Sequence, residues 1–170
     1  AGQTKDGLVG SELGSKTVGI IGTGAIGLRT AQLCKAFGCK VIANAPHPKK
    51  EAEGIVEYVD LETLLKESDI ISLHCPLNDS SRGLINKERI ALMKPTAIVI
   101  NAARGPVVDS QALADALNEG RIAGAGIDVF EVEPPLDVNH PLLHSKNTIV
   151  TPHVAFASAE SMEARCHIVF

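Results

Sequence analysis

Short aliphatic runs alternate along the chain with segments whose apolar residues recur at helical spacing. Most of the runs show little polar alternation, which is typical of parallel strands buried on both faces of a sheet. Strands that alternate with helices indicate βαβ units. We therefore predict strands at Thr17–Ile21, Lys40–Ala43, Ile70–Leu73, Ala97–Ile100, Ala125–Val129 and Thr148–Val150.

The segments between and after these strands predict helices. Asp109 or Ser110 can cap one of them, and Gly120 stands where a glycine often follows the end of a helix. The predicted helices are Ala25–Phe37, Leu61–Lys66, Lys87–Met93, Gln111–Asn118 and Ala157–Val169. The resulting fold class is α/β, a doubly wound parallel sheet of the Rossmann type.

The length of 170 residues fits one domain, residues 1–170, in which residues 1–14 form an entry linker and residues 158–170 a returning helix that the chain end cuts short. A net charge of −4 without a basic stretch argues against a nucleic-acid partner. No apolar run approaches the ~18 residues that span a bilayer, and no signal peptide is evident. The four cysteines lack metal-ligand spacing, so we expect reduced thiols, no metal site and a cytosolic location.

A glycine-rich hexapeptide, Gly22-Thr-Gly-Ala-Ile-Gly27, lies between the first predicted strand and the first predicted helix. In this context Gly22 permits a tight turn, Gly24 lets the backbone approach a pyrophosphate, and Gly27 allows close packing of the helix. The amino end of the helix also offers free N–H groups to phosphates. The hexapeptide therefore predicts a dinucleotide site.

One expected part of this site is missing. A carboxylate about 20 residues further on usually binds the adenosine ribose, but the second strand here leads into Asn44 and Ala45. Asn44 could bond a ribose hydroxyl, whereas His47, Lys49 or Lys50 could reach a 2′-phosphate. We expect NAD as the cofactor and keep NADP as the alternative.

At this point the sequence resembles a known family, the D-isomer-specific 2-hydroxyacid dehydrogenases. The matching segments follow the family's order over nearly the whole chain: KTVGIIGTGAIG (16–27), SLHCPL (72–77), RGLIN (82–86), INAARG (100–105), GAGIDV (124–129) and TPH (151–153). The segments EPP (133–135), PLL (141–143) and HVAFAS (153–158) look most like the glycerate dehydrogenase, or hydroxypyruvate reductase, branch.

The resemblance implies three catalytic residues. His153 would protonate the substrate carbonyl as hydride arrives and would act as the base in the reverse direction. Glu133 would bond the other ring nitrogen and fix its tautomer. Arg104 would hold the substrate carboxylate or keto oxygen with its planar fork. Formate dehydrogenases resemble this family but place Gln at the Glu133 position, so Glu133 favours a hydroxy acid.

The resemblance also implies the cofactor contacts. Beside the three glycines, Asn44 and Ala45, these are Ala25, Ile26, Cys75, Pro76, Ala102, Ala103, Arg104, Asp128 and His153. Asp128 would face the nicotinamide carboxamide. Ligands of open α/β sheets collect beyond the carboxyl ends of the strands, where these positions are expected.

Three functions follow. The first is hydride transfer between a nicotinamide cofactor and a small 2-oxo acid such as hydroxypyruvate or glyoxylate, in a homodimer as in the family. The second is a module that binds cofactor without turnover, because family enzymes are much longer and have a substrate domain for which this chain offers no segment. The third is an NAD-sensing scaffold, because the family includes corepressors that keep these motifs.

Overall fold

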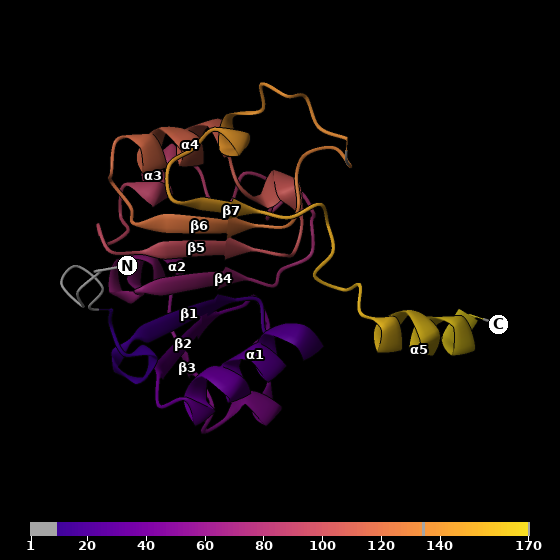
Figure 1. Cartoon of the computed structure of the whole chain (residues 1–170). Helices are drawn as coiled ribbons and strands as arrows, with labels where there is room; N and C mark the ends of the chain where they lie inside the picture. The colour runs from indigo at the N-terminus through magenta and orange to yellow at the C-terminus, as the bar shows by residue number, and fades with distance from the viewer. Residues whose placement is uncertain (1–9, 134, 170) are drawn as a thin grey trace, which may run out of the picture.

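A parallel sheet of seven strands, in the order β3-β2-β1-β4-β5-β6-β7, forms the centre of the molecule (Figure 1). The computed structural model describes residues 10–133 and 135–169, so most of the expected entry linker lies outside the described residues. The strands are β1 (Thr17–Ile21), β2 (Lys40–Asn44), β3 (Glu57–Tyr58), β4 (Ile70–Leu73), β5 (Ile98–Asn101), β6 (Gly124–Ile127) and β7 (Thr148–Val150). The order reverses between β1 and β4, which confirms the doubly wound fold.

The helices cover the two faces of this sheet unequally. They are α1 (Ala25–Ala36), α2 (Leu61–Glu67), α3 (Lys87–Ile90), α4 (Ser110–Asn118) and α5 (Ala159–Val169). α2 contacts α3 and α3 contacts α4, whereas α1 packs on β1 and β2 (Figure 1). Right-handed crossovers place α1 on one face and α2, α3 and α4 on the other. The reason is that α1 leads the chain towards the β3 edge of the sheet, whereas α2, α3 and α4 lead it towards the β7 edge. α5 extends away from the sheet in Figure 1.

The predicted elements are confirmed, although most bounds shift by one or two residues. β6 ends at Ile127 rather than Val129, and α5 begins at Ala159 rather than Ala157. The larger differences are the following. β3 was not predicted, because its two residues are too short for a detectable alternation. α3 ends at Ile90 rather than Met93, because Leu92 and Met93 bond carbonyls only three residues back, in a tighter turn. A 3-10 turn, η1 (Leu13–Ser15), occupies the end of the expected linker.

Two clusters of buried side chains lie on the opposite faces of the sheet. Val18 and Ile20 of β1 pack with Ala31 of α1 in the smaller cluster. Ile21 of β1 and the side chains on the other face of the sheet belong to the larger cluster, which lies under α2, α3 and α4. The middle of β1 is therefore buried on both sides, as the unbroken aliphatic run predicted.

The sheet around β5, β6 and β7 is different, because one of its faces is uncovered among the described residues. Ile98 and Ile100 of β5 are 39% and 38% exposed, and Ile149 of β7 is 73% exposed. The register places Gly124 and Gly126 of β6 between these side chains. This open face is the side of the sheet opposite to α3 and α4.

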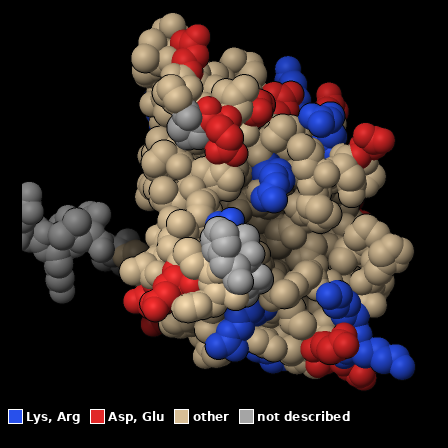
Figure 2. Space-filling view, turned by 90° about the vertical axis from the view of Figure 1, so that its right-hand side faces the viewer, with Lys and Arg blue, Asp and Glu red and all other residues tan. Residues whose placement is uncertain are grey.

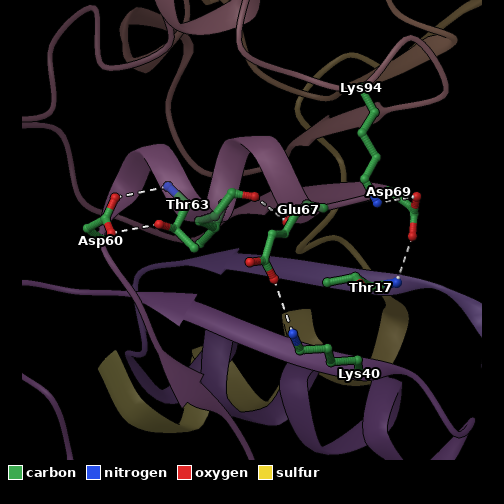
Figure 3. Close-up of polar contacts among 9 residues, drawn as sticks. Thr17, Lys40, Asp60, Thr63, Glu67, Asp69 and Lys94 are labelled. Carbon is green, nitrogen blue, oxygen red and sulfur yellow. Dashed lines mark hydrogen bonds and ion pairs between the residues drawn. The ribbon is translucent and has the colours of Figure 1, made fainter.

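Figure 3 shows polar contacts at both ends of α2 and at the amino ends of β1, β2 and β4. The Asp60 carboxylate accepts a hydrogen bond from Thr63 N at 2.9 Å and so caps α2. Asp69 accepts from Thr17 N and pairs with Lys94, both at 2.9 Å. Burial alone would raise the pKa of Asp69, but these two partners outweigh it and lower the pKa. The contacts of Asp69 therefore tie the amino ends of β1 and β4 to Lys94.

Candidate functional site

The three predicted catalytic residues meet at the carboxyl end of the sheet. Arg104 follows β5, Glu133 follows β6 and His153 follows β7. Figure 2 shows the side of the molecule to which the strands point, with a hollow near its centre and Lys and Arg side chains around it. A cavity of about 770 Å³ is lined by all three residues. Segments from three neighbouring strands thus converge on one site.

The loop that carries Arg104 is shaped by Asn101, the last residue of β5. Asn101 is buried, and its side-chain oxygen accepts a hydrogen bond from Ala103 N at 3.1 Å. Its amide nitrogen donates to Arg104 O at 3.0 Å. The Arg104 guanidinium donates to the carbonyl of Ala103 and is exposed. The backbone of this loop is therefore fixed while the guanidinium can meet a ligand.

Glu133 and His153 form a hydrogen-bonded pair. His153 Nδ1 lies 3.0 Å from each carboxylate oxygen of Glu133. The His153 side chain is 29% exposed and that of Glu133 is 76% exposed. Because the carboxylate accepts the Nδ1 proton, Nε2 is the ring nitrogen available for a ligand.

His153 has a left-handed backbone, with φ of 57°. Such angles are uncommon for residues other than glycine and need support from the surrounding structure. The Asp128 carboxylate supplies it by accepting from Val154 N and Ala155 N at 2.9 Å each, and from Thr151 Oγ1 at 2.5 Å. The chain on both sides of His153 is thereby tied to the end of β6.

Asp128 is thus a structural anchor as well as a wall of the cavity. Burial alone would raise the pKa of its carboxyl group, but the hydrogen bonds from Thr151, Val154 and Ala155 outweigh burial and lower the pKa. The carboxylate is ionised at neutral pH. Its predicted contact with the nicotinamide carboxamide remains a prediction.

His74 forms another part of the cavity wall. Its Nε2 lies 2.9 Å from Ser72 Oγ, and burial lowers the pKa of its imidazole. A neutral ring at physiological pH suits a wall residue better than a proton donor.

The glycine loop has the geometry that a dinucleotide needs. Gly22 has φ of 96°, and a Cβ on Gly27 would lie 2.0 Å from Gly22 O. A Cβ on Gly24 would meet nothing within 4 Å, so the loop presents bare backbone there. No side chain caps α1, and its first turn carries no acidic residue. The N–H groups at this end can therefore receive a pyrophosphate.

The predicted contacts divide between two cavities on either side of this loop. A smaller cavity of about 370 Å³ is lined by Gly22, Asn44, Ala45, Cys75 and Pro76, among others. The larger cavity contains the predicted residues Ile26, Ala102, Arg104, Asp128 and His153. Ala25 and Gly27 lie in α1 beside them, and Ala103 is buried within the Arg104 loop. We expect the smaller cavity to receive the adenosine half of a dinucleotide and the larger cavity the nicotinamide half.

A family model for the "D-isomer specific 2-hydroxyacid dehydrogenase, NAD binding domain" matches residues 1–155. The chain belongs to this family. The matched domain binds NAD, which confirms the preferred cofactor.

Two relatives of the dehydrogenase family illustrate the similarity. The hydroxypyruvate reductase of Thermotoga maritima is 49% identical over 158 residues, which make up 92% of this chain and 51% of that protein. The glyoxylate reductase of Aeropyrum pernix is 49% identical over 156 residues, 91% of this chain and 46% of that protein. The chain spans about half the length of these relatives.

Solved structures of the family agree with the fold. The D-lactate dehydrogenase of Lactobacillus jensenii with NAD+ gives a TM-score of 0.89 at 40% identity and covers 98% of this chain and 54% of its own. The Aquifex aeolicus D-lactate dehydrogenase complexed with NAD and lactic acid gives 0.88 at 37% identity, covering 99% and 56%. The chain corresponds to one domain of these dehydrogenases.

One residue that shapes this site, Tyr58, was not predicted. Tyr58 of β3 donates from its hydroxyl to Thr23 Oγ1 at 2.9 Å and so braces the glycine loop. The amide nitrogen of Asn44 donates to Val59 O at 2.9 Å, which leaves its carbonyl oxygen for a ribose hydroxyl. The β-branched residues around Tyr58 were the available signal for β3.

Two further observations concern membranes and metal ions. Among residues 10–133 and 135–169, no helix is long and apolar enough to cross a membrane. Within the same ranges, no group of His, Cys, Asp and Glu side chains could hold a metal ion.

Proposed function

We propose that this domain is the cofactor half of a D-2-hydroxyacid dehydrogenase active site, which transfers hydride between NAD and a small 2-oxo acid such as hydroxypyruvate or glyoxylate. The observation that carries the proposal is the convergence of Arg104, Glu133 and His153 on one cavity beside the glycine loop. The similarity to hydroxypyruvate and glyoxylate reductases supports the substrate class.

The proton chemistry rests on the His153–Glu133 pair. His153 Nε2 faces the substrate and donates a proton to the carbonyl oxygen during reduction, while Nδ1 stays bonded to Glu133 at 3.0 Å. The carboxylate fixes the tautomer and balances the positive charge of the ring before the proton leaves. In the oxidative direction the same nitrogen takes the hydroxyl proton. When bound, NADH supplies the hydride.

Arg104 provides the charge that selects an acid. Its exposed guanidinium stands on a loop whose backbone Asn101 fixes, so two parallel N–H groups can meet a carboxylate. A lysine at this position would supply charge without the planar fork. Arg104 is therefore proposed as the substrate clamp.

The chain alone also supports a second function, cofactor binding without turnover. Glu133 is 76% exposed and the cavity is open, so water would weaken the electrostatic contacts that the reaction requires. An NAD-sensing scaffold is a further alternative of this kind. We also propose a homodimer and a cytosolic location, as in the family.

Calorimetric titration of the chain with NADH and NADPH tests the proposal. We expect NADH to bind and NADPH to bind more weakly. Failure of both to bind would contradict a cofactor domain. Hydroxypyruvate and glyoxylate are then added with NADH and the absorbance of NADH is followed. Negligible turnover supports binding alone for this chain, whereas a rate typical of enzymes would contradict it.

A further inference from the structure

The loop of residues 131–140, which carries Glu133, is closed at its neck by side chains. His140 Nε2 lies 3.1 Å from a Glu131 carboxylate oxygen, Oε2. The rings of Phe130 and His140 meet edge to face, with centroids 5.2 Å apart. Surface loops whose ends are joined in this way lose conformational freedom over their whole length.

The second Glu131 oxygen ties this neck to the Arg104 loop. Ser110, the first residue of α4, donates its hydroxyl to Glu131 Oε1 at 2.5 Å. Upstream, a Cβ on Gly105 would lie 1.9 Å from the carbonyl of Phe130, so the two loops are in close backbone contact. We call Ser110, Glu131 and His140 the loop clamp.

Glu133 itself has few restraints. Within the described residues its recorded hydrogen bonds go only to His153. Its side chain is 76% exposed, so packing does not hold it. The position of Glu133 therefore depends on the neck of the loop, two residues away.

The hydrogen bonds of the clamp are mutually consistent. Leu142 N donates to His140 Nδ1, so Nε2 must carry the ring proton and donate it to Glu131. Burial alone would raise the pKa of Glu131, but the bonds from Ser110 and His140 outweigh it and lower the pKa. At neutral pH the ionised carboxylate of Glu131 therefore accepts hydrogen bonds from both Ser110 and His140.

We propose that Glu131 is a positioning residue: with Ser110 and His140 it holds the Glu133 carboxylate against His153 and in register with the Arg104 loop. The proposal deepens the proposed function, on which the catalytic meaning of the Glu133–His153 pair rests. The clamp touches no reacting atom.

The test measures which nitrogen of the His153 ring carries the proton. Long-range ¹H–¹⁵N spectra of the chain report this tautomer at a pH well above the ordinary histidine pKa. We expect an Nδ1-protonated ring in the unmodified chain, because Glu133 accepts that proton. Glu131→Ala should reduce the ratio of Nδ1-protonated to Nε2-protonated ring about tenfold, comparable to the loss of one hydrogen bond.

Three variants make the result specific. Glu131→Gln should keep the tautomer, because its oxygen can accept from His140 while its N–H donates to Ser110 Oγ. Glu133→Ala gives the ratio expected without the partner. Glu67→Ala is the matched control, because it removes an exposed ion pair with Lys40 far from the site. Amide spectra establish that each variant is folded.

A folded Glu131→Ala chain that keeps the unmodified ratio overturns the proposal, as does an unmodified chain without the Nδ1 proton. If Glu131→Ala does not fold, Ser110→Ala and His140→Phe decide in the same way, since each removes one arm of the clamp. NADH affinity, expected to change less than about twofold in all clamp variants, is measured separately. Loss of NADH binding in the unmodified chain would refute the proposed function without affecting the tautomer result.

Discussion

The glycine loop and the loops that carry the proposed catalytic residues Arg104, Glu133 and His153 are built in opposite ways. The glycine loop depends on backbone that packs so closely that a Cβ on Gly27 would lie 2.0 Å from a carbonyl oxygen. The loops that carry Arg104 and His153, the proposed catalytic residues, depend on buried polar side chains, because Asn101 and Asp128 hold their backbone in place. The first region has no space for an added atom at Gly22 and Gly27. The second region should tolerate substitutions of its exposed side chains but not of the buried residues Asn101 and Asp128.

The largest effect is expected from Gly27→Ala. The added methyl group must displace the Gly22 backbone, at a cost of about 1–3 kcal/mol and with loss of most NADH binding. Gly24→Ala is the matched control, because its Cβ would meet no atom within 4 Å. It should leave the melting temperature nearly unchanged while weakening NADH binding, as seen by calorimetry. Equal effects of the two variants on stability would contradict the comparison.

Much of this contrast could be predicted from the sequence. The glycine spacing gave the cofactor loop, because the need for Gly is local to a few residues. Arg104, Glu133 and His153 emerged from family motifs rather than from the pattern of the chain. Asn101, Tyr58 and the loop clamp could not be found in this way, because their roles depend on contacts between segments far apart in the chain.

Substitution of Asp128, which anchors the His153 loop, should have the next largest effect on the free energy of unfolding. Asp128→Asn places an amide group among three donors and should cost about 2 kcal/mol at neutral pH. The pKa of Asp128 is lowered in the fold, so its stabilisation is present above the ordinary value of 3.8 and is lost as the pH falls through the lower folded value. Denaturation by urea at neutral and acidic pH should show the two proteins converging in acid. Asp79→Asn, at an exposed residue, is the control; a constant difference at all pH values would argue against the anchor.

Substitutions at His153 separate its chemistry from its backbone. His153→Val should lower stability by about 1–2 kcal/mol, because a β-branched residue is strained at a φ of 57°. His153→Asn should change stability by less than about 0.5 kcal/mol, since Asn accepts left-handed angles. Both remove the imidazole, so thermal melts of the pair measure the backbone effect alone. Equal melting temperatures would show that the loop relaxes.

The smallest effect is expected in the adenosine cavity, where Ala45 lies close to Asn44. Ala45→Asp should raise the preference for NADH over NADPH about tenfold, because the carboxylate accepts from ribose hydroxyls and repels a 2′-phosphate. Calorimetry with both cofactors measures the ratio. Asn78→Asp, at another residue that lines the same cavity, is the control for charge. An equal shift in both variants would mean that charge alone, rather than a ribose contact, sets the preference.

The two edges of the sheet present unequal hazards for aggregation. The edge at β3 consists of two residues and offers little backbone for another chain to pair with. At the other edge, β7 has β6 as its one neighbouring strand among the described residues, and Ile149 is 73% exposed. Intermolecular strand pairing would therefore begin at β7, and a lysine in place of Ile149 would act as a gatekeeper there.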